Sequence, residues 1–292
     1  TEALADGRPV VALESTLISH GLPVPHNLQA AQKAEAVIRA GGAVPATIAV
    51  IDGQVRVGLS TAELERLADT SNPWKVSRDN LATAIAQNAT GGTTVAATMF
   101  CAYQARIGIF ATGGIGGVHR GWQESLDISA DLRELSHTPV TVVCSGVKSL
   151  LDLPATLEYL ETMGVPVIGF ATDELPAFFS IESGLVLRQS VSDVAGATTI
   201  IEKRRALQLE GGEILAVPPP AHAALPQAQV EQWIESAISE VHSTGLRGQS
   251  VTPFLLTRLR ELSGGRTLTP NMALIEHNAA TAAALAGEIS SV

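Results

Sequence analysis

The sequence lacks the features of several large protein classes. Only two cysteines occur in 292 residues, and Cys101 and Cys144 lie far apart inside apolar stretches, which is typical of buried free thiols in a reducing compartment. There is no run of basic residues, and 19 basic against 29 acidic side chains give a formal net charge of −10. Non-specific binding of DNA or RNA requires a basic surface, so no nucleic-acid partner is expected.

No segment has the composition of a targeting or membrane-spanning sequence. The first residues lack a basic stretch followed by an apolar one, and the weakly charged stretch at 81–107 is interrupted by Gln, Asn, Thr and a glycine pair. We therefore expect a cytoplasmic protein with no membrane partner. Hydrophobic residues make up 46% of the chain, enough to bury a large core and to exclude disorder.

Short runs rich in valine and isoleucine alternate with longer amphipathic segments, which is typical of a parallel sheet covered by helices. The predicted strands are 9–16, 47–51, 106–112, 140–144 and 165–170, with a hairpin arm at 54–58 after the turn Asp52-Gly53. The predicted helices are 27–40, 61–69, 94–105, 190–207, 227–243 and 270–289. These elements predict one α/β domain over residues 1–292, with a helical C-terminal extension from about residue 218.

Candidate functional residues are sought after each predicted strand, because ligands of open α/β sheets bind at the carboxyl ends of strands. The strand that begins at Ile109 runs into a glycine cluster at 113–117. It is not a dinucleotide fingerprint, since the third glycine position holds His119. The cluster predicts either a backbone cradle for a phosphate or sugar phosphate, or a tight turn that needs positive φ.

Lysine is scarce, which makes its positions informative. The 19 basic residues comprise 15 arginines and four lysines, and two of these lysines follow or interrupt apolar segments: Lys148 comes after the strand at 140–144, and Lys75 lies within residues 73–78. Desolvation lowers the pKa of a lysine and leaves a nucleophilic amine, a task that arginine cannot perform. The alternative for Lys148 is a lysine that keeps its charge in water or binds phosphate.

Three carboxylates, like the two lysines, are candidates for a role in chemistry. Glu14 ends the first predicted strand after four apolar residues, where it is either a paired structural charge or a general acid. Asp127 and Asp131 are spaced i, i+4; on a helix they would share one face and hold a divalent cation. The alternative is a helix N-cap and a surface acid.

Taken together, these segments make the chain resemble the pseudouridine-5'-phosphate glycosidase family over nearly its whole length. The matching segments are 12–21, 42–49, 75–77, 93–96, 110–121, 127–132, 142–148 and 252–256. The resemblance implies an α/β/α layered fold with a mixed, mainly parallel sheet, and commonly a homotrimer. It also implies a substrate in which ribose 5-phosphate is joined through a carbon–carbon bond to an aromatic base, together with a divalent metal such as Mn²⁺.

The resemblance also implies roles for residues at matching positions. Lys148 is similar to the family's imine-forming nucleophile, Glu14 to its proton donor, and Lys75 to a lysine that contacts the substrate and joins the catalytic set. Asp127 matches the metal ligand. The remaining predicted substrate-binding residues are Val95, Thr112, His119, Ser129, Ala130, Asp131 and Asn271.

These residues suit a carbon leaving group. Such a group has no lone pair to protonate, unlike the oxygen in ordinary glycosides, whereas an amine attached at C1' of an opened ribose supplies an electron sink. Flanking positions depart from the family: Gly-Gln-Ser at 248–250, Asp79-Asn80 after Ser77-Arg78, Leu126, and Val217-Pro218.

The first hypothesis, which follows from the resemblance, is a glycosidase that releases uracil. The alternatives are a C-glycosynthase acting on a larger aromatic or polyketide aglycone and, more remotely, a non-catalytic sugar-phosphate binding protein.

Overall fold

Ten strands of the described chain form one mixed, mainly parallel sheet. The computed structural model describes residues 2–244 and 251–290, and its sheet runs in the order β4-β5-β2-β1-β6-β7-β10-β8-β9, with β3 paired to β2. The strands are β1 (Val10–Leu13), β2 (Val44–Ile51), β3 (Gln54–Val57), β4 (Trp74–Val76), β5 (Gly91–Thr93), β6 (Ile109–Ala111), β7 (Thr141–Cys144), β8 (Val167–Phe170), β9 (Gln189–Val191) and β10 (Glu213–Ala216).

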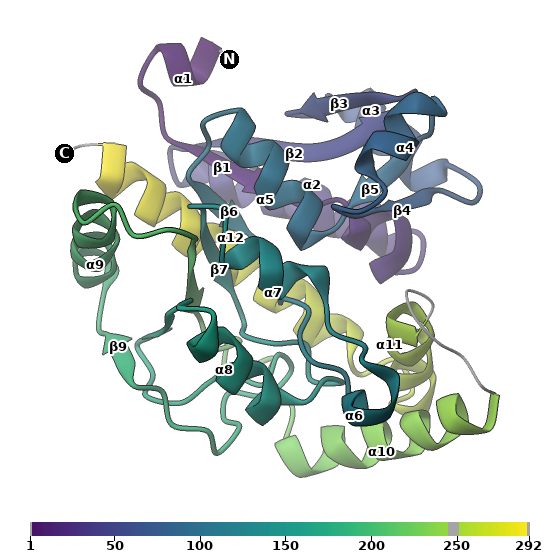
Figure 1. The fold of residues 1–292 in the computed structure, drawn as a ribbon. Helices are drawn as coiled ribbons and strands as arrows, with labels where there is room; N and C mark the ends of the chain where they lie inside the picture. The colour runs from purple at the N-terminus through teal and green to yellow at the C-terminus, as the bar shows by residue number, and fades with distance from the viewer. Residues whose placement is uncertain (1, 245–250, 291–292) are drawn as a thin grey trace.

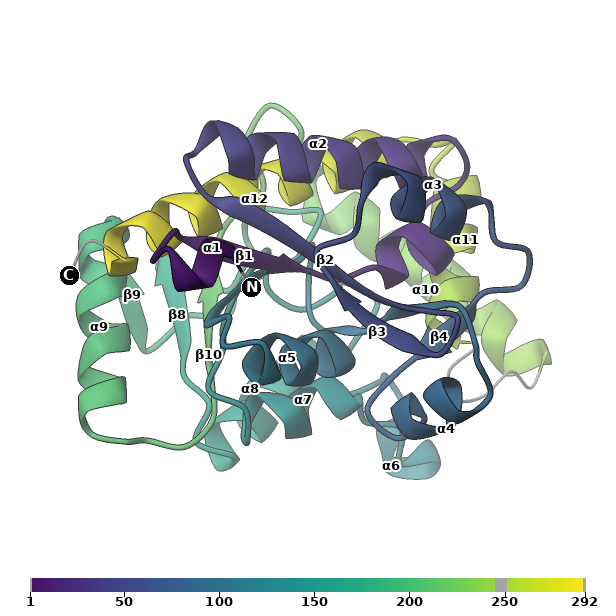
Figure 2. The same ribbon diagram turned by 90° about the horizontal axis from the view of Figure 1, so that it is seen from above.

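Helices cover both faces of this sheet, as Figures 1 and 2 show. The helical elements are α1 (Glu2–Ala5), the π-helical turn η1 (Leu17–Gly21), α2 (His26–Ala40), α3 (Thr61–Asp69), α4 (Leu81–Ala86), α5 (Val95–Gln104), α6 (Trp122–Ser125), α7 (Ala130–Leu135), α8 (Leu153–Thr162), α9 (Val194–Ala206), α10 (Gln227–Thr244), α11 (Val251–Leu262) and α12 (Leu268–Ser290). In Figure 2, α2 and α12 lie on one face, while α5, α7 and α8 lie on the other. The expected α/β/α layering is confirmed.

The directions of the strands follow from their connections. Every pairing along the run β2-β1-β6-β7-β10-β8-β9 is parallel, and helical crossovers make such pairing possible. β3 and β5 are antiparallel to β2, and β4 is parallel to β5. The sheet is therefore mixed only near β2, on the side that carries Lys75 in β4.

The C-terminal helices differ from the expected extension in one respect. Helical structure after residue 218 is confirmed by α10, α11 and α12, but α12 packs against α2 and against the central strands β1, β6 and β7. Its inward side chains are small and buried, with Ala279, Ala282 and Ala283 at 0% exposure. Small side chains let the helix approach the sheet closely, so α12 is part of the central core rather than an appendage.

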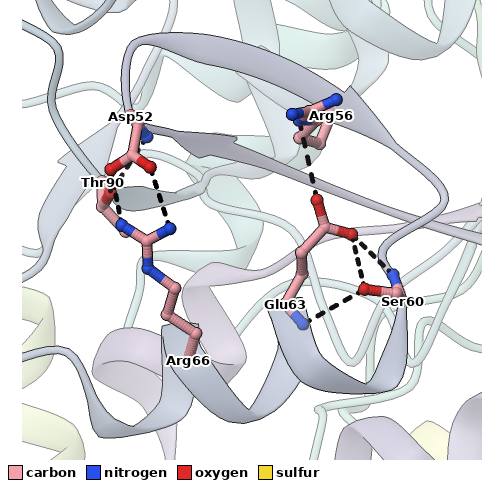
Figure 3. A network of polar contacts seen from close by, with 6 residues as sticks. All are labelled: Asp52, Arg56, Ser60, Glu63, Arg66 and Thr90. Carbon is pink, nitrogen blue, oxygen red and sulfur yellow. Dashed lines mark hydrogen bonds and ion pairs between the residues drawn. The ribbon is translucent and has the colours of Figure 1, made fainter.

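The predicted hairpin arm is confirmed, and α3 holds it in place (Figure 3). Asp52 and Gly53 both adopt positive φ, 49° and 70°, as a two-residue hairpin turn requires. Arg66 of α3 donates to both carboxylate oxygens of Asp52, while Glu63 forms a capping box with Ser60 and an ion pair with β3 at 3.6 Å. Both salt bridges therefore join the exposed arm to the helix that follows it.

One helix prediction is wrong at its start, and several short elements were missed. The helix expected over 190–207 begins only at Val194, because Ser190 and Val191 belong to β9 and Asp193 caps α9 by accepting the N–H of Gly196. Short elements such as β4, β5, β10 and α8 were not predicted.

The segment 248–250, where the sequence departs from the family pattern, lies outside the described residues. No helix among residues 2–244 and 251–290 is long and apolar enough to cross a membrane.

Candidate active site

Nine of the predicted site residues line one cavity of about 260 Å³, which we call the acidic cavity. Its lining comes from the segments after β1 and β7, from β4, and from the N-termini of α5 and α7. The predicted residues present are Glu14, Lys75, Val95, His119, Asp127, Ser129, Ala130, Asp131 and Lys148, and the others are Thr16, Ser77, Asp79, Thr94, Gly116, Ile128 and Leu151. Residues drawn from between positions 14 and 151 of the sequence thus meet in one site.

Glu14 is held between two hydroxyl groups. The side chains of Thr16 and Thr112 each donate a hydrogen bond to its carboxylate, one to each oxygen. Thr112 is buried and follows β6 directly, so it acts on Glu14 from behind. The structure therefore places Thr112 beside the predicted proton donor rather than on the wall of the cavity.

The two predicted lysines share the cavity. Burial, together with the positive charge of Lys148, lowers the pKa of Lys75, whereas Asp131, Glu14 and Asp127 act in the opposite direction. A lowered pKa increases the fraction of neutral amine at a given pH. The site therefore combines two amines, one of which is desolvated, with a carboxylate held in a fixed position.

Asp131 is a buried acid, contrary to the surface position considered for it. Its carboxylate accepts the backbone N–H of Ala96 at 2.9 Å and that of Gly116 at 2.8 Å. It is not the N-cap of α7, because that position is Ser129. The helical i, i+4 arrangement is also wrong: Asp127 precedes α7, which begins at Ala130. Both aspartates nevertheless line the acidic cavity.

The glycine cluster lets neighbouring side chains lie close to its backbone. No glycine in 113–117 has a positive φ, so the tight-turn interpretation is wrong. A Cβ atom on Gly116 would lie 2.2 Å from Oγ of Ser129 and 2.7 Å from Oδ2 of Asp131. The anion that meets the Gly116 amide is thus the carboxylate of Asp131, and this amide is not part of a phosphate cradle.

Asp127 lies beside His119. The distance from Asp127 Oδ2 to His119 Nδ1 is 3.9 Å, and burial lowers the pKa of His119 against the opposing charge of Asp127. Within the described ranges, no three His, Cys, Asp or Glu side chains lie close enough to form a metal site. A divalent cation held by Asp127 would therefore need further ligands, and Mg²⁺-like ions usually keep several water molecules.

A smaller cavity of about 70 Å³ adjoins the acidic one and contains Asn271. We call it the apolar cavity, because Leu17, Phe178, Pro253 and Leu256 form much of its wall. It also includes Gly21, Gly113, Gly114 and His20, whose pKa is lowered by burial and by Lys75. Glu14, Thr16, Lys75 and Lys148 line both cavities.

Sequence reasoning missed several lining residues. Phe178 lies between β8 and β9 with φ of +61°, and nothing in its sequence neighbourhood marks it. Asp79 was noted only as a departure from the family pattern, yet it lines the acidic cavity. His20 lies within a segment that carries the resemblance, so attention to that segment was the signal that could have found it. Both cysteines are free and buried, as expected.

Comparison with known proteins places this arrangement in a family. Residues 1–288 match the family model described as "Indigoidine synthase A like protein". The pseudouridine-5'-phosphate glycosidase of Paracoccus denitrificans (strain Pd 1222) is 52% identical over 99% of this chain and 96% of its own length. That of Solibacter usitatus (strain Ellin6076) is 54% identical over 97% of this chain and 95% of its own length.

Two solved structures share the fold over nearly the full chain. An indigoidine synthase A-like protein from Thermotoga maritima has a TM-score of 0.91 at 35% identity and covers 97% of this chain and 94% of its own. The prealnumycin C-glycosynthase AlnA, solved in complex with ribulose 5-phosphate, has a TM-score of 0.91 at 38% identity and covers 99% of this chain and 94% of its own.

Proposed function

The chain belongs to the family of indigoidine synthase A like proteins, and from this premise we propose that it is a pseudouridine-5'-phosphate glycosidase. The reaction is the hydrolysis of the carbon–carbon bond between C1' of ribose 5-phosphate and C5 of uracil. Relatives of this name match nearly the whole chain at about 50% identity. The site supplies the groups that this reaction requires.

The observation that carries the proposal is the position of Glu14, Lys75 and Lys148. These three side chains line both cavities, so they lie where a sugar phosphate in the acidic cavity would be joined to a base in the apolar cavity. The reacting bond would therefore lie beside two amines and a carboxylate. Holding reactants in this way supplies much of the rate enhancement of an enzyme.

In the proposed mechanism, the neutral amine of Lys148 bonds to C1' through Nζ as the bond from C1' to the ring oxygen breaks. The proton that the nitrogen loses is taken up by that oxygen, which opens the ribose. The nitrogen lone pair then forms a C=N bond while the C1'–C5 bond breaks, and Glu14 delivers a proton to C5, so that uracil leaves. Water hydrolyses the iminium, releases ribose 5-phosphate and restores the lysine. The overall change is addition of one water molecule across the carbon–carbon bond.

The charge of the acidic cavity supports a bound divalent cation. Glu14, Asp79, Asp127 and Asp131 contribute carboxylates, against the amines of Lys75 and Lys148. A substrate phosphate adds further negative charge. We therefore propose that Asp127 holds Mn²⁺, which offsets the charge of the phosphate when bound.

The apolar cavity suits a flat aromatic base. Asn271 places an amide, which both donates and accepts hydrogen bonds, beside the apolar side chains of Phe178 and Leu256. A polar group in an apolar cavity discriminates among bases by hydrogen bonding. We propose that Asn271 contacts uracil and that Val95, His119, Ser129, Ala130 and Asp131 contact the sugar phosphate.

A second candidate is a C-glycosynthase that joins ribose 5-phosphate to a larger aromatic or polyketide aglycone. The likeness to AlnA favours it, but the greater identity to the glycosidases favours cleavage. A non-catalytic sugar-phosphate binding protein has no need of two amines beside a fixed carboxylate, because affinity alone requires no nucleophile.

Purified protein incubated with Mn²⁺ and pseudouridine 5'-phosphate tests the proposal, with uracil release as the readout and Lys148→Ala as the control. Rapid release that Lys148→Ala abolishes supports the glycosidase. Absence of release, with ribose 5-phosphate still trapped on Lys148 by borohydride, supports the C-glycosynthase. Absence of both contradicts an imine-forming enzyme.

We further propose that the protein is a homotrimer, as the resemblance implies, and that it acts in the cytoplasm, where buried free thiols stay reduced. Light scattering of the eluting protein during size-exclusion chromatography tests the first point. A mass of three chains of 30.4 kDa each supports it, and a monomeric mass contradicts it.

A further inference from the structure

Arg120 joins three separate segments of the chain. Its Nε donates to the carbonyl oxygen of Leu151 at 3.3 Å, and its Nη2 donates to that of Ser149 at 3.3 Å. The same guanidinium pairs with both carboxylate oxygens of Glu231, with Nη2 to Oε2 at 2.9 Å. A planar fork of donors is needed to reach these acceptors together.

Two of these acceptors belong to the turn that carries the proposed nucleophile. Ser149 and Leu151 follow Lys148, whose own N–H donates to the carbonyl oxygen of Ile115 at 3.1 Å. The glycine-rich segment therefore holds the backbone of Lys148 on one side, and Arg120 holds Ser149 and Leu151 on the other. Because a misplacement of 1 Å costs about 100-fold in rate, this backbone position matters for chemistry at Nζ.

The third acceptor, Glu231, lies on a helix that packs behind the wall of the apolar cavity. Glu231 lies in α10, which packs against α11, and α11 contributes Pro253 and Leu256 to that cavity. Figure 1 shows α10 and α11 side by side at this end of the molecule. The ion pair thus connects the Lys148 turn to α10, which packs against the helix that would face the aglycone.

Packing between α10 and the Lys148 turn is incomplete beside Arg120. A cavity of about 360 Å³ lies at the junction and is lined by Arg120, Ser149, Leu151, Gln227, Glu231 and Ile234, among others. Ile234 of α10 and Leu151 are nevertheless buried in the same core. The hydrogen bonds of Arg120 therefore add direction to apolar packing at this junction.

We infer that Arg120 and Glu231 form a positioning pair for the proposed reaction: they fix the Lys148 turn relative to the α10–α11 wall. Neither residue lines the acidic or the apolar cavity, so they act through Lys148 rather than on the substrate. The inference rests on the proposed function for its kinetic consequence, but its structural consequence can be measured without that function.

The kinetic test compares Arg120→Lys and Glu231→Gln with wild type. The readout is the rate of borohydride-trapped adduct formation on Lys148 at saturating ribose 5-phosphate. Arg120→Lys keeps the positive charge but loses the planar set of guanidinium donors, so we expect a rate of adduct formation about 10- to 100-fold lower. The ribose 5-phosphate concentration for half-saturation should change less than about threefold. Glu231→Gln should lower the rate by a smaller factor, and the double variant should resemble Arg120→Lys, because coupled residues are not additive.

Glu161→Gln is the matched control, since it breaks the exposed ion pair between Glu161 and Arg188, away from both cavities. It should leave the adduct rate unchanged. The inference is overturned if Arg120→Lys reacts at the wild-type rate, or if its rate falls only as far as its folded fraction falls. Glu231→Gln serves the same comparison if Arg120→Lys does not fold.

Hydrogen exchange separates this inference from the proposed function. In Arg120→Lys the amides of residues 148–152 should exchange faster than in wild type, while those of the remote strand β2 should not change. Unchanged exchange at 148–152 overturns the inference, whether or not ribose 5-phosphate reacts. If wild type forms no adduct while exchange at 148–152 responds as expected, the proposed function fails and the positioning of the turn stands.

Discussion

The carboxylate of Asp131 accepts the backbone N–H of Gly116 at 2.8 Å, which ties the start of α7 to the glycine-rich segment after β6. The same carboxylate binds the N–H of Ala96 at the start of α5. A charged acceptor makes each of these bonds stronger than a neutral one would. One buried acid therefore sets the spacing of three segments that form the wall of the acidic cavity.

Gly116→Ala should disrupt this arrangement, because the new Cβ would lie 2.2 Å from Oγ of Ser129. Forcing extra volume into a packed site costs about 1–3 kcal/mol, and we expect a lower melting temperature and a loss of uracil release of about 100-fold. Gly287→Ala in α12 is the control, since nothing lies within 4 Å of its added Cβ. A Gly116→Ala variant with wild-type activity would show that the close approach is dispensable.

Lys75→Met should remove an ammonium group that is costly to bury. Because the pKa of Lys75 is lowered in the folded protein, the unfolded chain binds more protons between the folded pKa and the unfolded value of about 10.4. The stability of wild type therefore rises with pH across that window, and the burial cost is present in full below it. Lys75→Met should melt higher than wild type at pH 7 and should lose most activity.

The measurement is a series of melting curves from pH 7 to above pH 10. The difference in melting temperature between Lys75→Met and wild type should shrink as the pH rises. The variant Lys203→Met, at an exposed lysine, should show no such trend. A constant advantage across the series would mean that charge burial is not its cause.

Asp127→Asn should weaken Mn²⁺ binding, because a neutral amide replaces the carboxylate proposed to hold the cation. We expect the Mn²⁺ concentration for half-maximal activity to rise at least about tenfold. Asp79→Asn alters charge in the same cavity without removing the proposed ligand, so its effect should be smaller. Counting free Mn²⁺ by electron paramagnetic resonance gives the affinity directly, and equal weakening in both variants would contradict the assignment.

Asn271→Ala should weaken binding of the base and leave binding of the sugar phosphate nearly unchanged. The side chain lines the apolar cavity alone, so its loss should raise KM for pseudouridine 5'-phosphate by about 10- to 100-fold, the cost of one unmade hydrogen bond. Trapping of ribose 5-phosphate on Lys148 should stay within about threefold of wild type. A matching fall in trapping would place Asn271 in contact with the sugar instead.

The sequence predicted the central strands because they are runs of β-branched and apolar residues. β1, β2, β6, β7 and β8 all fall within or across predicted strands. β5 is Gly-Gly-Thr, which has the composition of a turn, and β9 is polar Gln-Ser-Val at the start of a predicted helix. Strands of three residues depend on their neighbours for pairing, so local composition cannot identify them.

The candidate site was likewise predicted only in part from the sequence. The scarcity of lysine and the apolar surroundings of Lys148 and Lys75 brought both to attention, and both line the acidic cavity. The i, i+4 spacing of Asp127 and Asp131 suggested one helix for both, but Ser129 between them has an extended backbone and α7 begins only at Ala130. Which residues approach across the cavity depends on strand order, and spacing along the chain carries no information about that.

The apolar cavity is lined both by Glu14, which follows the first strand, and by Asn271, in the last helix. On a ribosome that adds 5–20 residues per second, Asn271 is made roughly 10–50 s after Glu14. During that interval the faces of β1 and α2 that α12 later covers have no partner. The newly made chain therefore carries exposed apolar surface until α12 has been made and packed against it.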